Sequence, residues 1–434
     1  MGRNGRLRTN GLRLVCFMAL AWVLAFAGTA HGESAPAADG YRIVALGDSL
    51  TAGYEPGMTE KSVPYGYTDR FREQALFHGR AKLGNFAILG LRTDGLLNLL
   101  QGAQDGKVLK AADIQDFADP RVAAMAEGIG ARTAELRQSL AEANVVLMTI
   151  GANDFSDFLR SLLNESAQDA AAAFENDFNT ILNKYAEEAE KTVRLTAELA
   201  PNARILLADQ YLPLPKLFAP DLYDLLYEKA VSPLTATVDA LTAKLQAEGI
   251  NVLPVHVAEK FKGREGGLTH MSVSLEGDAK PDIHPTQAGY EAMAEAFSQA
   301  MWQEYRKPAK RPAGVPISVV VGGKEVITAN KPVVKPPGVT FLALRDISDA
   351  MGAELSWNEK TKTAVFRQNG REVSITIDSK TMVVNGAEQP LSTPAYLQPV
   401  GKEKKTYVPL AVIAGGLNYE VDYSKNLQTA FINP

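Results

Sequence analysis

The sequence of 434 residues contains a single cysteine, Cys16. Cys16 lies in a leader segment that we predict to be removed, and a mature chain without it has no thiol. A disulfide framework and a cysteine nucleophile are therefore excluded, and export without disulfides fits this composition. An excess of positive charge is also missing, because the formal net charge is −5 at pH 7. This acidic balance argues against a nucleic-acid partner, which requires a basic face.

Long hydrophobic runs are scarce as well, and the one at Leu14–Ala27 has 14 residues. The basic start before it has no acidic residue and carries Arg3, Arg6, Arg8 and Arg13. Small residues follow around Ala30-His31-Gly32, and this order is typical of a secretory signal peptide. A membrane anchor is the alternative, but a spanning helix needs about 20 apolar residues. We therefore predict a signal peptide at residues 1–32, no transmembrane segment after its cleavage, and a secreted or cell-surface-associated protein.

Residues 41–305 alternate short apolar β-type runs with longer amphipathic stretches. The expected strands are Arg42–Leu46, Asn85–Leu89, Val145–Ile150, Arg204–Ala208 and Asn251–Val255. The expected helices include Val122–Ala143, Ala170–Ala200, Leu222–Glu248 and Gln287–Tyr305. This alternation predicts an α/β domain with a mostly parallel sheet and helices on both faces. Ligands of such sheets bind beyond the carboxyl ends of the strands.

The residue pattern changes after residue 305. A chain of this length is expected to hold more than one domain. Residues 306–316 are rich in proline and positive charge and predict a linker. Residues 317–434 contain a repeat at an offset of 66 residues, in which Thr340–Leu344 matches Thr406–Leu410. Each copy reads as a strand, a short helix and two strands, and Asn369-Gly370 predicts a hairpin turn. We expect a smaller α+β domain there.

Four short blocks in the first domain carry side chains suited to acyl transfer. Gly47-Asp48-Ser49-Leu50 follows the first strand, where a turn would expose the Ser49 hydroxyl as a nucleophile. Gly90 ends the second expected strand and can offer a backbone N–H to an oxyanion. Asn153 follows the third strand and can offer a side-chain amide, although it can also serve as a helix cap.

The fourth block, Asp282-Ile283-His284-Pro285, lies just before the last expected helix. A histidine is the natural base for a serine hydroxyl, and a nearby carboxylate can fix its tautomer. His284 is the one histidine outside the leader that combines a nearby Asp with a following Pro and a helix start. Each block is weak alone, but all four converge above one sheet edge if the domain folds as expected.

In this order, the blocks resemble the SGNH (GDSL) hydrolase family over residues 41–305. The resemblance implies a flavodoxin-like three-layer α/β/α sandwich with Ser49 as nucleophile and His284 as general base and acid. It also implies an oxyanion hole made by the Ser49 and Gly90 N–H groups and the Asn153 side chain. The family usually has its acid three residues before the histidine, where this chain has Pro281. Asp282 is then the candidate third member, and a Ser-His dyad assisted by a backbone carbonyl is the alternative.

Residues 317–434 resemble the copper amine oxidase-like N-terminal domain, carried by Val320–Lys324, Thr340–Glu354 and Thr406–Gly416. Copper is not implied, because this region has no histidine and no cysteine. The resemblance suggests a stalk or a module that binds a cell-wall or glycan ligand.

The leading hypothesis is therefore a secreted GDSL-type serine esterase or lipase that uses no cofactor and no metal. Its substrate would be a small-molecule or lipid ester, such as a lysophospholipid. The loop between Tyr54 and Tyr67 would line the pocket or lie at the surface without a role. One alternative is a carbohydrate O-acetyl esterase acting on a cell-wall or extracellular polysaccharide. Another is a non-catalytic envelope-binding protein, which the offset position of Asp282 keeps open.

Overall fold

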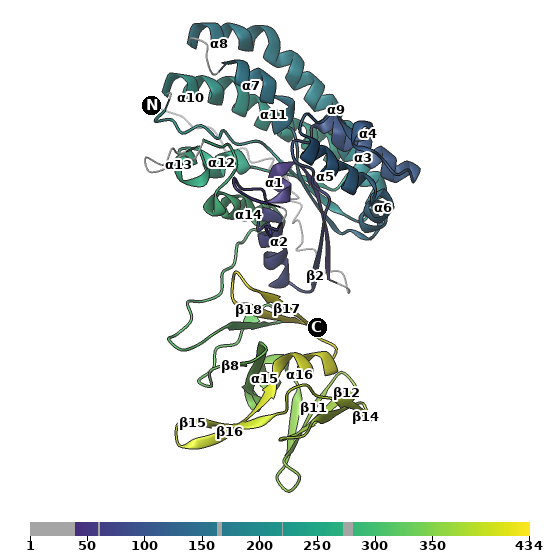
Figure 1. Cartoon of the computed structure of the whole chain (residues 1–434), viewed down its shortest axis with the longest axis vertical. Helices are drawn as coiled ribbons and strands as arrows, with labels where there is room; N and C mark the ends of the chain where they lie inside the picture. The colour runs from purple at the N-terminus through teal and green to yellow at the C-terminus, as the bar shows by residue number, and fades with distance from the viewer. Residues whose placement is uncertain (1–39, 60, 163–166, 219, 272–280) are drawn as a thin grey trace, which may run out of the picture. The chain divides into compact units, whose positions relative to one another are not determined.

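The structure is a computed structural model that describes residues 40–59, 61–162, 167–218, 220–271 and 281–434 (Figure 1). The predicted signal peptide at residues 1–32 lies outside these ranges. Within the part of the chain that is described, no helix has both the length and the apolar character needed to cross a bilayer.

A five-stranded parallel sheet forms the centre of the first domain. Its strands are β1 (Tyr41–Gly47), β2 (Ala81–Asn85), β3 (Val145–Thr149), β4 (Arg204–Ala208) and β5 (Val252–Val255). Their spatial order is β2-β1-β3-β4-β5, which is the flavodoxin-like order. The predicted α/β class is confirmed.

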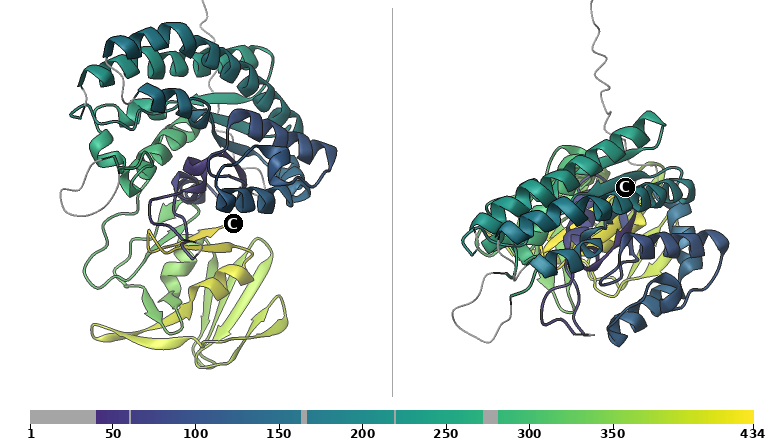
Figure 2. Two further views of the ribbon diagram at one scale, coloured as in Figure 1. Left: turned by 45° about the horizontal axis from the view of Figure 1, so that its top comes forward. Right: turned by 90° about the horizontal axis from the view of Figure 1, so that it is seen from above.

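Helices cover both faces of this sheet (Figures 1 and 2). The longer ones are α2 (Tyr67–Leu76), α3 (Thr93–Asp105), α5 (Pro120–Gly130), α6 (Thr133–Glu142), α9 (Asn179–Leu199), α11 (Ser232–Ala247) and α14 (Gln287–Trp302). The shorter ones are α1 (Ser49–Ala52), α4 (Ala111–Ile114), α7 (Ser156–Leu162), α8 (Ala167–Ala173), α10 (Pro220–Leu226), α12 (Val257–Phe261) and α13 (Glu265–Leu268). The described residues of this domain also form one 3₁₀ turn and two π turns: η1 (Ala152–Asp154), η2 (Phe174–Phe178) and η3 (Tyr227–Val231).

Alternate residues of the strands enter two separate cores. Val44 and Leu46 of β1 pack with α3, α6 and α9 on one face. Ile43 and Ala45 pack with α2 and α14 on the other. This period of two, with both sets buried, is what a sheet covered on both faces requires.

The second expected strand is wrong in position. The ladder of β2 covers Ala81–Asn85, four residues earlier than expected. Residues 86–89 still run beside β1, since the N–H groups of Phe86 and Ile88 donate to Ala45 and Gly47 carbonyls at 3.0 Å. The buried side chains Phe86 and Ile88 produced the apolar signal without a continuous ladder.

Three expected helices are interrupted. The stretch 122–143 divides into α5 and α6 after Gly130, because glycine is a poor helix former. The stretches 170–200 and 222–248 each contain a π turn, η2 and η3, which inserts a residue into the helical ladder. Periodicity alone therefore located these helices but not their breaks.

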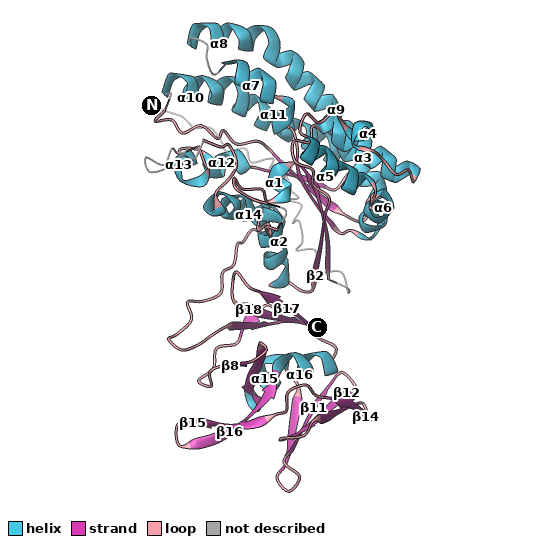
Figure 3. Ribbon diagram, viewed as in Figure 1, coloured by secondary structure: helices cyan, strands magenta, loops and turns pink. Residues whose placement is uncertain are grey.

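The C-terminal domain is mostly antiparallel β-structure with two helices (Figure 3). Its strands are β6 (Ser318–Val321), β7 (Lys324–Glu325), β8 (Val333–Lys335), β9 (Val339–Ala343), β10 (Glu354–Asn358), β11 (Thr363–Gln368), β12 (Arg371–Thr376), β13 (Thr381–Val384), β14 (Ala387–Pro390), β15 (Tyr396–Val400), β16 (Glu403–Pro409), β17 (Glu420–Ser424) and β18 (Thr429–Asn433). Its helices are α15 (Leu344–Met351) and α16 (Leu410–Gly416). The sheet orders are β10-β11-β12-β13-β14, β15-β16-β9-β8 and β17-β18-β6-β7.

The repeat predicted from the sequence is confirmed as a repeat of elements. The first copy gives β9, α15, β10 and β11, and the second gives β16, α16, β17 and β18. The first strands of the two copies pair with each other, with Phe341 opposite Pro409. The predicted hairpin at Asn369-Gly370 joins β11 to β12, and both residues have positive φ, as a type I′ turn requires.

Candidate active site

Ser49 lies where β1 turns into α1. Gly47 ends the strand with φ 144°, and a Cβ there would lie 2.0 Å from the Thr149 carbonyl oxygen of β3, so only glycine fits. The buried Asp48 caps α1, since its Oδ1 accepts a hydrogen bond from the Leu50 N–H at 3.0 Å. Ser49 thereby becomes the half-buried first residue of α1, at the carboxyl edge of the sheet.

The structure brings His284 and Asp282 to this serine. His284 Nε2 lies 2.9 Å from Ser49 Oγ, across 235 residues of sequence. His284 Nδ1 lies 2.6 Å from Asp282 Oδ1, which also accepts the His284 backbone N–H at 2.8 Å. The two-residue spacing therefore lets one carboxylate oxygen hold both the ring and the backbone of the histidine. A serine, an imidazole and a carboxylate in this sequence of hydrogen bonds form the arrangement that activates a serine nucleophile.

Gly90 and Asn153 lie on the neighbouring segments of the same sheet edge. Asn153 belongs to η1, directly after β3, and its Nδ2 donates to the Leu91 carbonyl at 3.0 Å and to Asp48 Oδ2 at 3.4 Å. Gly90 lies in the turn before α3, and its carbonyl accepts from Gln115 Nε2 at 3.0 Å. No acceptor among the described residues bonds the Gly90 N–H. The Asn153 amide is thus tied to both the serine turn and the Gly90 turn.

Comparison with known families identifies the family of the chain. A family model described as GDSL-like Lipase/Acylhydrolase matches residues 43–297, which is more than half of the chain. The chain belongs to this family. It is a hydrolase that acts on ester bonds, and its C-terminal part, residues 320–432, matches the copper amine oxidase N-terminal domain. No curated protein matches the sequence.

Solved structures similar to this hydrolase include three esterases or lipases. The lipase Lip_vut3 from a goat rumen metagenome is 21% identical, with 59% of this chain and 96% of that chain covered and a TM-score of 0.37. Phospholipase A1 from Streptomyces albidoflavus is 18% identical, with coverage of 62% and 100% and a TM-score of 0.40. A variant of the acetyl-xylooligosaccharide esterase Axe2 from Geobacillus is 16% identical, with coverage of 61% and 96% and a TM-score of 0.33.

The histidine of this GDSL hydrolase is clamped by a neighbouring strand-like segment. The His270 N–H donates to the His284 carbonyl at 3.0 Å, and the Asp282 N–H donates to the His270 carbonyl at 3.1 Å. The ring of Tyr54 packs edge-on against the His284 ring, with centroids 4.7 Å apart. The expectation from the sequence covered Tyr54 only as part of a loop near the site, and it missed His270, which has no motif of its own.

Burial shifts the pKa values of three titratable groups at this site. Desolvation lowers the pKa of His284 below its ordinary 6.5, and the charge and hydrogen bond of Asp282 oppose this effect. His284 is therefore neutral at pH 7, which is the state that a general base requires. Desolvation also raises the pKa of Asp48 to about 7 and that of Asp154 to about 6. Within the described ranges, no group of His, Cys, Asp and Glu side chains is arranged to hold a metal ion.

Proposed function

We propose that this GDSL hydrolase is an exported esterase that cleaves lipid esters, with lysophospholipid-like esters as the first substrate class. The observation that carries the proposal is the hydrogen-bonded series Ser49 Oγ, His284 and Asp282, at 2.9 Å and 2.6 Å. Export is supported by the basic and apolar leader, as set out from the sequence. The role of residues 317–434 as a glycan- or wall-binding module stays a prediction.

The chemistry follows from the geometry. Ser49 Oγ attacks the acyl carbonyl carbon while His284 Nε2 takes the hydroxyl proton, and Asp282 stabilises the resulting imidazolium. The carbonyl oxygen becomes an oxyanion, for which the Ser49 N–H, the Gly90 N–H and the Asn153 amide would be the donors. Asn153 Nδ2 would donate to it in place of the 3.4 Å contact with Asp48 Oδ2 and would keep its bond to the Leu91 carbonyl. The tetrahedral intermediate collapses, the alcohol leaves with the proton from His284, and acyl-Ser49 remains. Water, deprotonated by His284, then repeats the sequence and releases the acid and free Ser49.

An exposed apolar side chain beside His284, and a second on the loop that carries Tyr54, favour a lipid over a sugar ester. Ile283, which directly precedes His284, is 52% exposed, and its carbonyl is held by the Tyr211 hydroxyl at 2.9 Å. Val63 is 89% exposed on the same loop as Tyr54. Apolar side chains around an ester-cleaving site would contact an acyl chain, whereas a glycan site would present polar groups.

A substrate panel tests the acyl preference. We expect the purified chain to hydrolyse p-nitrophenyl butyrate and octanoate, and lysophosphatidylcholine, with a higher kcat/KM than p-nitrophenyl acetate and acetylated xylan. Each methylene buried on binding contributes about 0.8 kcal/mol, or up to a few-fold in kcat/KM. A clear preference for acetate and for acetylated xylan would refute the lipid assignment and support the O-acetyl esterase alternative.

The pH profile tests the roles of His284 and Asp282. We expect kcat/KM to be level around pH 7 and to fall in acid with a midpoint below 6.5, because the buried imidazole must be neutral to act as base. Asp282→Asn removes the charge that favours the imidazolium. The midpoint should therefore move to still lower pH, while the plateau rate falls by roughly 10²- to 10⁴-fold.

The measurement is kcat/KM for p-nitrophenyl butyrate at constant ionic strength, from pH 4.5 to 8.5. Asp105→Asn serves as the matched control, since Asp105 is the last residue of α3, at the end away from the site, and pairs with Lys107. A profile of Asp282→Asn with an unchanged plateau and an unchanged midpoint would remove Asp282 from the catalytic set and favour the Ser-His dyad.

A further inference from the structure

The two central strands of the sheet β17-β18-β6-β7 are buried on both faces. All residues of β6 and β18 are buried. Val319 and Ile432 point into the core of the C-terminal domain. Val320 and Phe431, one position along, join the hydrolase core instead, where Phe431 packs edge-on against Phe77 at 5.0 Å between centroids. The sheet therefore contributes side chains to both domain cores. If the C-terminal domain moved freely relative to the hydrolase, Val320 and Phe431 would be exposed to water.

Helix α2 of the hydrolase receives most of the polar contacts from this sheet. Asn433 Nδ2 donates to the carbonyls of Leu76 and Gly79, at 3.0 and 2.8 Å, and so caps the carboxyl end of α2. Along the helix, Arg72 pairs with Asp422 of β17. The C-terminal domain therefore contacts α2 directly through its side chains.

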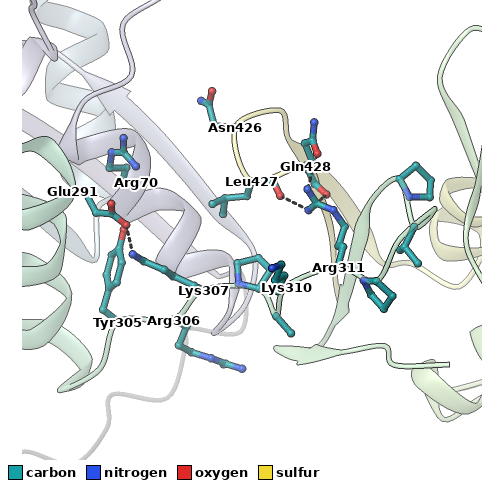
Figure 4. A pocket seen from close by; sticks show the side chains of 15 residues that line it. Arg70, Glu291, Tyr305, Arg306, Lys307, Lys310, Arg311, Asn426, Leu427 and Gln428 are labelled. Atoms are coloured by element: carbon teal, nitrogen blue, oxygen red, sulfur yellow. Dashed lines mark hydrogen bonds and ion pairs between the residues drawn. The ribbon is translucent and has the colours of Figure 1, made fainter. Parts of the chain in front are cut away.

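The segment between the two domains, residues 306–316, forms hydrogen bonds with both the hydrolase and the C-terminal domain. The Arg306 guanidinium lies over the Phe77 ring and bridges the carbonyls of Phe77 and Gly323. Further along, Arg311 donates to the Leu427 carbonyl and to Gln428 Oε1, at 3.0 and 2.6 Å. Arg306 and Arg311 line a groove of about 660 Å³, together with Arg70 and the Lys307–Glu291 pair. Figure 4 shows Arg311 beside Leu427 and Gln428, and Lys307 paired with Glu291.

One contact on α2 involves a buried charge. Glu73 lies on α2 with 7% of its surface exposed, and its Oε1 accepts a hydrogen bond from Ser424 Oγ of β17. Its Oε2 accepts the Tyr65 hydroxyl at 2.7 Å. Burial raises the pKa of Glu73, and the hydrogen bonds of Ser424 and Tyr65 act against this rise. A buried carboxylate is stabilised by its hydrogen-bond donors. Loss of the Ser424 hydroxyl therefore also disturbs the hydrogen bond between Glu73 and Tyr65.

From Tyr65 the contacts continue to the active site. The Arg70 guanidinium lies over the Tyr65 ring at 4.2 Å and donates to Gln287 Oε1 at 2.7 Å. Gln287 Nε2 in turn donates to Glu55 Oε1 and to the Tyr65 carbonyl. Glu55 follows Tyr54, the residue whose ring packs on His284.

Glu55 also contacts the segment that clamps the catalytic histidine. Its Oε2 lies 3.4 Å from His270 Nε2. The backbone of His270 holds the backbone of both His284 and Asp282. Tyr54, Glu55 and Tyr65 therefore connect the buried Glu73 to the groups that fix the base.

We propose that the C-terminal domain positions the catalytic histidine of the hydrolase, through Ser424, Glu73 and Tyr65 and the loop residues Tyr54 and Glu55. The proposal rests on the proposed catalytic function of His284. It makes Ser424, Glu73 and Tyr65 positioning residues, since none of them contacts Ser49, His284 or Asp282. The domain then serves the esterase reaction whether or not it also binds a wall or glycan ligand.

The test is Ser424→Ala in the full chain, beside Ser424→Thr and Ser379→Ala. Ser424→Thr keeps a hydroxyl for Glu73. Ser379→Ala removes a serine hydrogen bond inside the C-terminal domain, to the Thr381 carbonyl, that does not involve Glu73. We expect Ser424→Ala to lower kcat for p-nitrophenyl butyrate about three- to tenfold, the effect of losing the hydrogen bond to Glu73. Ser424 Oγ also accepts the Leu427 N–H, as Ser379 Oγ accepts the Thr381 N–H, so the two alanine variants each lose one such local bond. Ser424→Thr should restore the rate, and Ser379→Ala should match the unaltered chain.

Hydrogen–deuterium exchange gives a readout that does not use activity. In Ser424→Ala, peptides from residues 54–66 should exchange faster, while peptides from β11 and β12 should not change. This result would stand even if Ser49 were not the nucleophile, so failure of the catalytic assignment is distinguishable. Unchanged exchange in residues 54–66 together with unchanged kcat in Ser424→Ala would overturn the proposal. A lower melting temperature with unaltered kcat and unaltered loop exchange would overturn it equally, because the contact would then be structural only.

Discussion

Ser49→Ala should reduce ester turnover by roughly 10⁴- to 10⁶-fold, the loss seen when a serine nucleophile is removed. The reason is that Ser49 Oγ is the atom hydrogen-bonded to His284 Nε2, at 2.9 Å, and no acyl-enzyme can form without it. Any remaining rate would come from binding and the oxyanion donors acting on water. Alanine fits the first turn of α1, whose cap is supplied by Asp48, so the fold should persist.

The assay is p-nitrophenyl butyrate hydrolysis by purified protein, with circular dichroism to show that the variant is folded. Ser139→Ala is a matched control, because Ser139 lies in α6, away from the sheet edge that carries Ser49, and alanine favours a helix. Equal rates for Ser49→Ala and the unaltered chain would contradict the nucleophile assignment. That result would favour the non-catalytic envelope-binding alternative for this chain.

His284→Ala should cost several orders of magnitude, roughly 10⁴- to 10⁶-fold, because a serine hydroxyl without a base is a weak nucleophile. Asp282 then loses the imidazole and keeps only the backbone N–H of residue 284, and the Tyr54 ring loses the imidazole it packs against. The loss should exceed that of Asp282→Asn, since Asp282 acts through His284. Added imidazole should restore part of the rate by entering the space left by the ring, whereas it should not rescue Ser49→Ala.

A histidine outside the site provides the control. His256 is half-exposed and lies 3.7 Å from both Asp209 and Asp239, with no contact to Ser49. His256→Ala should therefore keep nearly the full rate. If His284→Ala hydrolysed the ester as fast as the unaltered chain, the assignment of His284 as the base would be contradicted, even if Ser49→Ala were inactive.

The sequence predicted the parallel sheet and the residues at its edge because these signals are local. The strands β1, β3 and β4 are short apolar runs, and Ser49 and Asn153 directly follow two of them. The strand β2 was misplaced because Phe86 and Ile88 are buried without forming a ladder. The role of Asp282 stayed open, because a family pattern counts residues, whereas the turn geometry that lets Asp282 Oδ1 reach His284 Nδ1 depends on backbone angles.

The contacts made by Glu73 were beyond sequence reasoning. Ser424 and Glu73 are 351 residues apart, and neither lies in a motif. Their contact exists because Val320 of β6 and Phe431 of β18 join the hydrolase core, where Phe431 packs on Phe77 directly after α2, and no local pattern encodes this. His270 was missed for a similar reason: its backbone, and not its side chain, holds the segment that carries His284.

Labelling with a fluorophosphonate tests most directly whether the Ser49 hydroxyl is activated by His284. When the serine Oγ bonds to phosphorus, the phosphorus–fluorine bond breaks and fluoride leaves. The base, His284, takes the hydroxyl proton of the serine. Intact-mass spectrometry should show one adduct per chain, peptide mapping should place it on Ser49, and Ser49→Ala and His284→Ala should both fail to react. An adduct on another residue, or a His284→Ala chain that labels as fast as the unaltered protein, would contradict the active site described for this hydrolase.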